Sequence, residues 1–68
     1  MTVPIVVNGD SRTVADGQTI LGLLHDLQLD PARVAVELNR RIVRQPKWGE
    51  THLEPDAQVE IVQFVGGG

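Results

Sequence analysis

The chain has 68 residues, of which 41% are hydrophobic and 22% charged, and its formal net charge is −3. A chain of this length forms one domain with a small core, because folding buries only about 60% of the surface exposed in the unfolded chain. The composition is that of a globular protein and argues against wholesale disorder, and the acidic balance argues against binding to nucleic acid through its phosphates.

Cysteine is absent, which removes disulfides, thiolate metal sites and a cysteine nucleophile together. In so small a domain, the lack of disulfides fits a reducing cytosol better than secretion. The longest apolar runs are three residues, at 5–7 and 34–36, which is too short for a membrane span or a signal peptide. We therefore expect a soluble cytoplasmic protein with no membrane partner.

A β-hairpin is predicted at the start of the chain. Residues 3–8 are mostly β-branched, as is typical of a strand, and residues 11–15 form the returning strand. The dipeptide Asn8-Gly9 between them tolerates the positive φ that a tight hairpin turn requires.

A short helix follows a turn at 16–18. Thr19 is suited to be its N-cap, and its apolar residues recur at i, i+3, i+4 and i+7: Ile20, Leu23, Leu24 and Leu27. Gly22 weakens this helix by about 1 kcal/mol relative to alanine, so the helix depends on tertiary packing. It ends before Pro31, because a residue that precedes proline is disfavoured in helical conformation.

Three further strands are predicted, at 34–38, 41–44 and 58–65. The first two are joined by a turn at Asn39-Arg40. Residues 45–57 contain two prolines and a glycine and are expected to form a long loop, held in place by Trp48 and Leu53. We therefore divide the chain into a folded domain at 1–65 and a flexible C-terminal glycine tail at 66–68.

One helix and four to five short strands bury a core only if the helix lies across one face of the sheet. Alternate residues of a strand point to the same face of the sheet, and the apolar helix residues named above lie on one side of the helix. Together they predict the members of this core: Val3, Ile5, Val7, Ile20, Leu23, Leu24, Leu27, Val34, Val36, Leu38, Val59 and Ile61. The fold class is therefore α+β, and the arrangement suits a β-grasp, the ubiquitin-like roll, with a mixed sheet.

The polar residues form no recognisable catalytic or metal-binding pattern. His25 and His52 lack a metal-ligand spacing and are expected to face solvent. Four of the six basic residues fall at 40–47, which we interpret as protection of an edge strand against aggregation, with contact to an acidic partner as the alternative. Trp48 is interpreted as a loop anchor rather than a platform for stacking bases.

The other face of the sheet is predicted to carry apolar residues. Val6, Val62 and Phe64 have the opposite parity to the predicted core residues of their strands, so they face solvent if the helix covers the inner face. Scattered surface hydrophobic residues are normal, whereas a cluster of them marks a binding site. We predict that these three residues form a partner-binding patch.

The sequence finishes with Gly66-Gly67-Gly68, directly after a predicted strand. A frayed terminus or a cloning linker is one explanation. The other is functional: glycine has no Cβ, so such a tail can enter a narrow channel in a partner and leave its carboxylate unhindered. A protein whose own C-terminus is activated as an acyl-adenylate needs this geometry.

The order and spacing of these features resemble the ThiS family, the sulfur carrier proteins of thiamine biosynthesis. The likeness covers essentially the whole chain and includes Asn8-Gly9, the helix at 19–24, Asp30-Pro31, residues 34–39, the Trp48 loop, residues 59–62 and Gly67-Gly68. The family ends in a glycine pair, and here a third glycine, Gly66, precedes that pair.

The resemblance implies a carrier rather than an enzyme, with no bound cofactor. A ThiF-type adenylating enzyme would use ATP to adenylate Gly68, and a sulfur donor such as a cysteine desulfurase would provide the sulfur of a thiocarboxylate. Thiazole synthase would then take this sulfur to build the thiazole ring. Gly66 and Gly67 would form the arm that carries the carboxylate into these partners.

Two alternatives stay open. The small subunit of molybdopterin synthase also ends in Gly-Gly, but its chains are usually longer and carry a proline before the tail, whereas residues 62–65 contain none. A non-covalent β-grasp binding module would dock a partner on the outer sheet face, and its glycines would be incidental.

Overall fold

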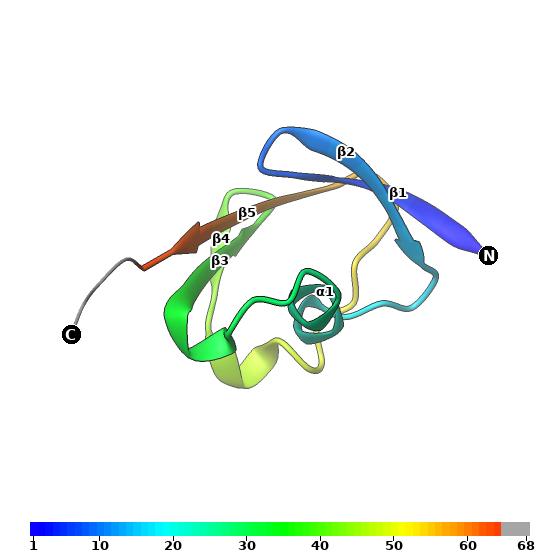
Figure 1. Ribbon diagram of the computed structural model, residues 1–68. Helices are drawn as coiled ribbons and strands as arrows, with labels where there is room; N and C mark the ends of the chain where they lie inside the picture. The colour runs from blue at the N-terminus through cyan, green and yellow to red at the C-terminus, as the bar shows by residue number, and fades with distance from the viewer. Residues whose placement is uncertain (65–68) are drawn as a thin grey trace.

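A computed structural model of the chain describes residues 1–64 and contains a five-stranded mixed sheet and one α-helix (Figure 1). The sheet has the order β2-β1-β5-β3-β4, in which β1 and β5 are parallel and the other neighbours antiparallel. The elements are β1 (Thr2–Val7), β2 (Asp10–Ala15), α1 (Ile20–Asp26), β3 (Val34–Leu38), β4 (Arg41–Val43) and β5 (Ala57–Gln63), with 3₁₀ turns at Pro31–Arg33 and Gln45–Lys47. The predicted β-grasp arrangement is confirmed.

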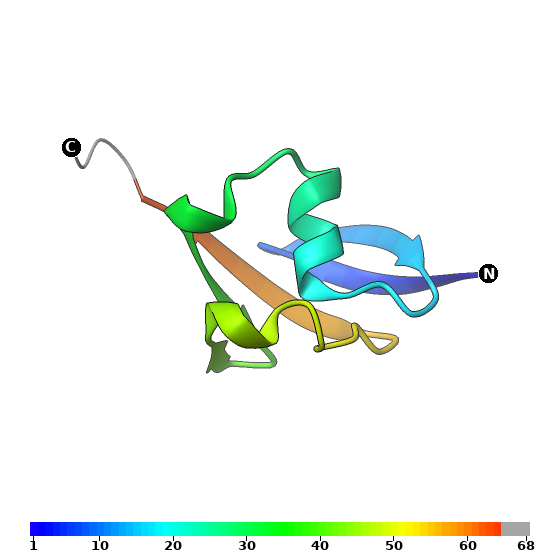
Figure 2. The ribbon, with the colours of Figure 1, turned by 90° about the horizontal axis from the view of Figure 1, so that it is seen from below.

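The helix lies across one face of the sheet and leaves the other face uncovered (Figures 1 and 2). Thr19 is the N-cap, as predicted, because its Oγ1 accepts a hydrogen bond of 3.1 Å from the Gly22 N–H. None of the helices within residues 1–64 has the length and apolarity that crossing a bilayer requires.

The core between helix and sheet contains the predicted side chains. Nine of the twelve are buried, and Val3, Leu27 and Leu38 pack against them at the margin. The structure adds Val14 and Ala57 to the core, which the pattern of alternation did not assign. The helix contributes Ile20, Leu23 and Leu24 to this core, whereas His25 and Asp26 at its end are exposed.

The predicted loop anchors are also part of this core. Trp48 and Leu53 are both buried, and the indole Nε1–H of Trp48 donates a hydrogen bond of 2.8 Å to the Val43 carbonyl. The long loop contains the 3₁₀ turn Gln45–Lys47 just before Trp48. Its backbone is tied to the region of the helix start, since the Leu53 N–H donates to the Gln18 carbonyl.

Two hairpins have the same tight turn. Asn8 and Gly9 have φ values of 50° and 85°, and Asn39 and Arg40 have φ values of 51° and 70°. Two successive positive φ values define the turn type that best matches the twist of a two-residue hairpin. Asn-Gly is the preferred pair for this turn. Arg40 occupies the second position of its turn, where glycine would adopt the positive φ without strain.

Candidate functional site

β5 is the central strand of the sheet and leads directly toward the three glycines. Phe64, the last described residue of the chain, directly follows β5, and its N–H donates a hydrogen bond of 2.7 Å to the Arg33 carbonyl. The predicted tail residues Gly66, Gly67 and Gly68, together with Val65, lie outside the described residues 1–64. The site that the structure shows is therefore the base from which the tail departs.

Asn8 attaches β5 to the end of β1. Its main-chain N–H donates to the Val59 carbonyl at 2.9 Å. Its side chain then bonds to both main-chain groups of Ile61: Nδ2 donates to the carbonyl at 3.1 Å, and Oδ1 accepts from the N–H at 2.7 Å. The Asn8 side chain thus extends the β1–β5 ladder by one residue after β1 has ended.

Asn39 acts in the same way on the other edge of β5. Its main-chain N–H donates to the Gln58 carbonyl at 2.7 Å, and its Oδ1 accepts from the Gln58 N–H at 2.9 Å. Sequence reasoning identified both asparagines as turn residues but missed these bonds to β5. The strand before the tail is therefore fixed on both edges by side chains as well as by its neighbours.

The outer face of the sheet carries exposed apolar side chains near the end of β5. Val62 is 60% exposed and Phe64 56%, as predicted, whereas Val6 is half-buried. The register places Val6 opposite Gln58 and Val62 opposite Ala35. Val62 near the end of β5 and Phe64 just after it therefore lie at the same end of this strand, whereas Val6 lies nearer its start.

Ile42 of β4 is the most exposed strand residue with a large apolar side chain in residues 1–64, at 77%. Its register partner is Glu37 on β3, so it belongs to the same outer face. Sequence analysis placed Ile42 in a strand without assigning its face. Its face becomes clear only in the structure, where its neighbour Val43 packs against the core.

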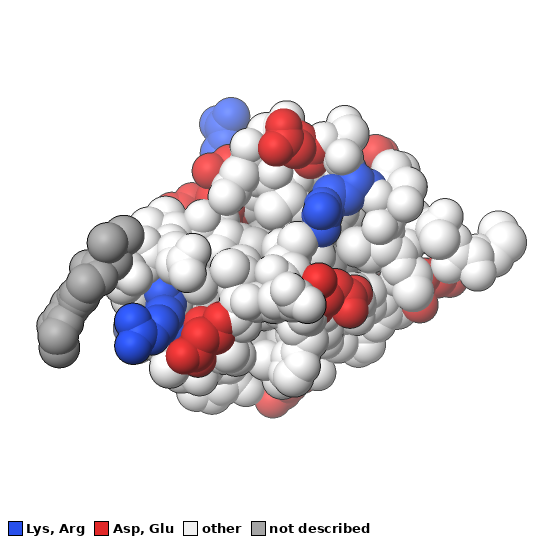
Figure 3. Space-filling view, in the orientation of Figure 1, with Lys and Arg blue, Asp and Glu red and all other residues white. Residues whose placement is uncertain are grey.

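Other polar positions show no catalytic arrangement. His25 and His52 are exposed, as predicted, and residues 1–64 contain no group of three histidine or acidic side chains that is able to hold a metal. β4 is an edge strand, as expected from its basic residues, and Figure 3 shows acidic and basic side chains interspersed on the face that it displays. An acidic partner for the basic residues stays a prediction.

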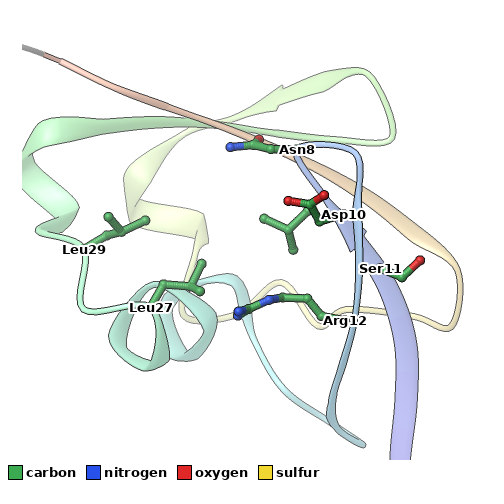
Figure 4. A pocket seen from close by; sticks show the side chains of 7 residues that line it. Asn8, Asp10, Ser11, Arg12, Leu27 and Leu29 are labelled. Carbon is green, nitrogen blue, oxygen red and sulfur yellow. The ribbon is translucent and has the colours of Figure 1, made fainter.

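A groove of about 380 Å³ lies between the β1–β2 hairpin and the C-terminal end of α1 (Figure 4). The hairpin side of the groove is mostly polar and the side formed by the end of the helix and the segment after it is apolar (Figure 4), and the residues that line it are Val7, Asn8, Asp10, Ser11, Arg12, Leu27 and Leu29. This lining contains neither histidine nor cysteine, and it offers no pair of groups suited to acid–base or nucleophilic chemistry. The groove is therefore not a candidate catalytic site.

The strand order, the single helix across one face and the central strand that leads to the glycines define a ubiquitin-like β-grasp domain. The family model of the ThiS family matches residues 5–68. The chain therefore belongs to the ThiS family.

Comparison with individual proteins agrees with this membership. A crystal structure of the thiamine biosynthesis protein ThiS from Geobacter metallireducens superposes with a TM-score of 0.83 and is 30% identical, covering 97% of this chain and 100% of that chain. The sulfur carrier protein ThiS of Bacillus subtilis is 40% identical over 63 residues, which are 91% of this chain and 96% of that protein.

A third relative is much longer than this chain. The thiazole synthase of Magnetococcus marinus is 41% identical over 64 residues, which are 94% of this chain but 20% of that protein. The chain thus spans about a fifth of the length of this relative.

Proposed function

We propose that this chain is a sulfur carrier of thiamine biosynthesis whose Gly68 carboxylate is adenylated and then converted to a thiocarboxylate. The observation that carries the proposal is the family match over residues 5–68, which includes all three glycines. The match to the sulfur carrier ThiS of Bacillus subtilis over 96% of its length supports the same role. It favours this function over the molybdopterin synthase subunit and over a passive binding module.

In the proposed chemistry, the chain is a substrate and its partners are the catalysts. The Gly68 carboxylate attacks the α-phosphorus of ATP held by a ThiF-type enzyme, and pyrophosphate leaves. Hydrosulfide, released by a thiol reductant from the persulfide of a donor such as a cysteine desulfurase, then attacks the acyl carbon, and AMP leaves as the thiocarboxylate forms. The resulting thiocarboxylate gives its sulfur to the thiazole ring.

The arrangement of β5 supports this role. Its backbone is held on one edge by Asn8 and on the other by Asn39, and Phe64 is bonded to Arg33. Beyond this fixed base, the three glycines span roughly 10 Å when extended, which suffices to carry a carboxylate from the domain surface into a partner's cleft. The fixed base determines where on the domain the arm that carries the carboxylate begins.

Thiazole synthase is the proposed sulfur acceptor. The thiazole synthase of Magnetococcus marinus contains a region 41% identical to this chain, which supports a functional link between this domain and that enzyme. Activation is proposed because a carboxylate is a poor electrophile until it is adenylated, and the ThiF-type enzyme and the sulfur donor are proposed from the resemblance to the ThiS family.

The experiment is an intact-mass measurement of the chain after incubation with the ThiF-type enzyme, ATP and sulfide. A carrier gains the mass difference between sulfur and oxygen, and omission of ATP abolishes the gain. Subsequent addition of thiazole synthase and its small-molecule substrates should return the chain to its original mass. A chain that stays unmodified under these conditions rules out the carrier function.

A further inference from the structure

Two carboxylates face each other on the outer face of the sheet. Glu37 of β3 is the register partner of Glu60 of β5, and both residues are exposed. Their neighbours Val36, Val59 and Ile61 are buried on the opposite face, so both glutamate side chains lie on the face that α1 leaves uncovered.

Neither glutamate has an ionic partner within residues 1–64, where the salt bridge present joins Arg33 and Asp30. Like charges directly opposite each other on neighbouring strands destabilise a sheet. The isolated domain therefore carries an unfavourable pair that a cation would neutralise.

Apolar side chains flank this pair on the same face. Ile42 is the register partner of Glu37 on its other side, so Ile42, Glu37 and Glu60 form one row across three strands. Val62 follows Glu60 by two residues along β5, and the exposed Phe64 comes two residues later. Exposed apolar residues that gather around unpaired charges are a feature of binding surfaces.

We infer that this face binds a partner which places an arginine or lysine against Glu37 and Glu60, within an apolar contact to Ile42, Val62 and Phe64. The inference rests on the proposed function, and the partner is the adenylating enzyme, because the apolar part of the face runs along β5 toward the tail that this enzyme must take. A guanidinium group suits the site, since its planar fork bonds to more than one carboxylate oxygen at once.

The charges argue against two other occupants. A second copy of this chain bound through the same face in a symmetric dimer would place carboxylates against carboxylates. A Ca²⁺ or Mg²⁺ ion takes six or more ligands, and residues 1–64 contain no cluster of three acidic or histidine side chains. Charge complementarity thus selects a basic side chain of another protein.

This role has an unusual consequence: removal of one carboxylate should stabilise the domain and weaken its binding. We expect Glu37→Gln and Glu60→Gln each to raise the midpoint of thermal unfolding by about 2–4 °C, because the repulsion is lost. Each should also weaken binding to the enzyme about fivefold, and the double variant should show a smaller dependence of affinity on salt. A purely structural role moves stability and binding in the same direction.

The test measures unfolding midpoints and, by calorimetric titration, the Kd for the purified adenylating enzyme at two salt concentrations. The matched control is Glu54→Gln, which removes the same charge from an exposed loop residue outside the sheet and should leave the Kd within about twofold. A double variant that binds like Glu54→Gln, or one that melts lower than the parent, overturns the inference. So does a parent chain that dimerises through this face.

A measurement of pyrophosphate release by the adenylating enzyme, with the chain as its substrate, distinguishes a failure of this inference from a failure of the proposed function. The double variant keeps Gly68, so it should raise the KM for the chain and leave kcat unchanged. If the parent chain supports pyrophosphate release and the double variant has the same KM as the parent, the docking inference alone is refuted. A parent that neither binds the enzyme nor supports pyrophosphate release refutes both.

Discussion

Gln18 and Asp26 are joined across the helix over Gly22. The Gln18 Nε2 donates a hydrogen bond of 2.8 Å to the Asp26 Oδ2, and its Oε1 accepts one of 3.2 Å from the Thr19 N–H. A Cβ at position 22 would collide with the amide of Gln18. The glycine that weakens the helix thus makes room for a side chain that connects the turn before the helix to its last residue.

This relationship predicts that Gly22→Ala and Gln18→Ala are not additive. In a Gln18→Ala background, Gly22→Ala should stabilise the domain by about 1 kcal/mol, which is the difference in helix propensity. In the parent background the gain should be smaller, because the Gln18 amide must move away. The unfolding free energies of the four variants form a double-mutant cycle, and equal gains in both backgrounds would contradict the packing described.

The two hairpin turns provide a matched pair of predictions. Arg40→Gly should stabilise the domain by about 0.5–1 kcal/mol, because glycine adopts the positive φ of this position without strain. Gly9→Ala should destabilise by a similar amount. The space around Gly9 is open, so only the backbone conformation opposes a side chain there. The free energies of unfolding from urea curves with unchanged slopes would measure both effects. A less stable Arg40→Gly variant would show that the Arg40 side chain stabilises the fold by more than its backbone strain destabilises it.

The asparagines that hold β5 are expected to contribute unequally. Asn8→Gly and Asn39→Gly keep a residue suited to positive φ and remove only the side-chain bonds to β5. Asn8 makes two such bonds to Ile61 in a partly buried position, and Asn39 makes one to Gln58 in an exposed position. We expect a loss of about 1–3 kcal/mol for Asn8→Gly and less than half of that for Asn39→Gly, measured by chemical unfolding. Equal losses would show that the turns, not these bonds, decide stability.

Much of the fold follows from local patterns in the sequence. Alternation in 34–38 and the i, i+3, i+4 spacing of Ile20, Leu23 and Leu24 place these side chains in the core, where the structure has them. Parity also predicts correctly that Val62 of β5 and Phe64 just after it are exposed. Both patterns act within one element, and this is why a single sequence suffices to read them.

Relationships between elements could not be predicted in the same way. Parity determines which face a residue occupies, but it does not determine which residue lies opposite. The pairing of Glu37 with Glu60 and the separation of Val6 from Val62 both depend on register. β4 has only three residues, too few for an alternating pattern to assign Ile42 to a face. The side-chain bonds of Asn8 likewise link residues 53 positions apart.

Phe64→Ala tests the apolar part of the outer face. Because the side chain is more than half exposed, its removal should leave the unfolding midpoint close to that of the parent. Binding to the adenylating enzyme should weaken by about tenfold if Phe64 is an aromatic anchor of the interface. Val6→Ala is the companion variant: Val6 lies apart from Val62 and Phe64, so we expect a smaller effect on the Kd. An unfolded Phe64→Ala variant would show that this side chain belongs to the core.

The last prediction concerns the glycine tail itself. Addition of one alanine after Gly68 locks the carboxylate that should react into a peptide bond, and Gly67→Val adds a branched side chain to the arm that should enter a partner's cleft. Neither change touches the buried residues of the domain, so both variants should unfold like the parent. The extended chain should form no thiocarboxylate. Gly67→Val should form it at least tenfold more slowly, because the approach of the carboxylate to ATP is obstructed. Intact mass after incubation with enzyme, ATP and sulfide measures both, and Gly66→Ala, a smaller change one residue further from the carboxylate, serves as the control. Full conversion of the extended chain without prior trimming of its last residue would exclude Gly68 as the carrier site.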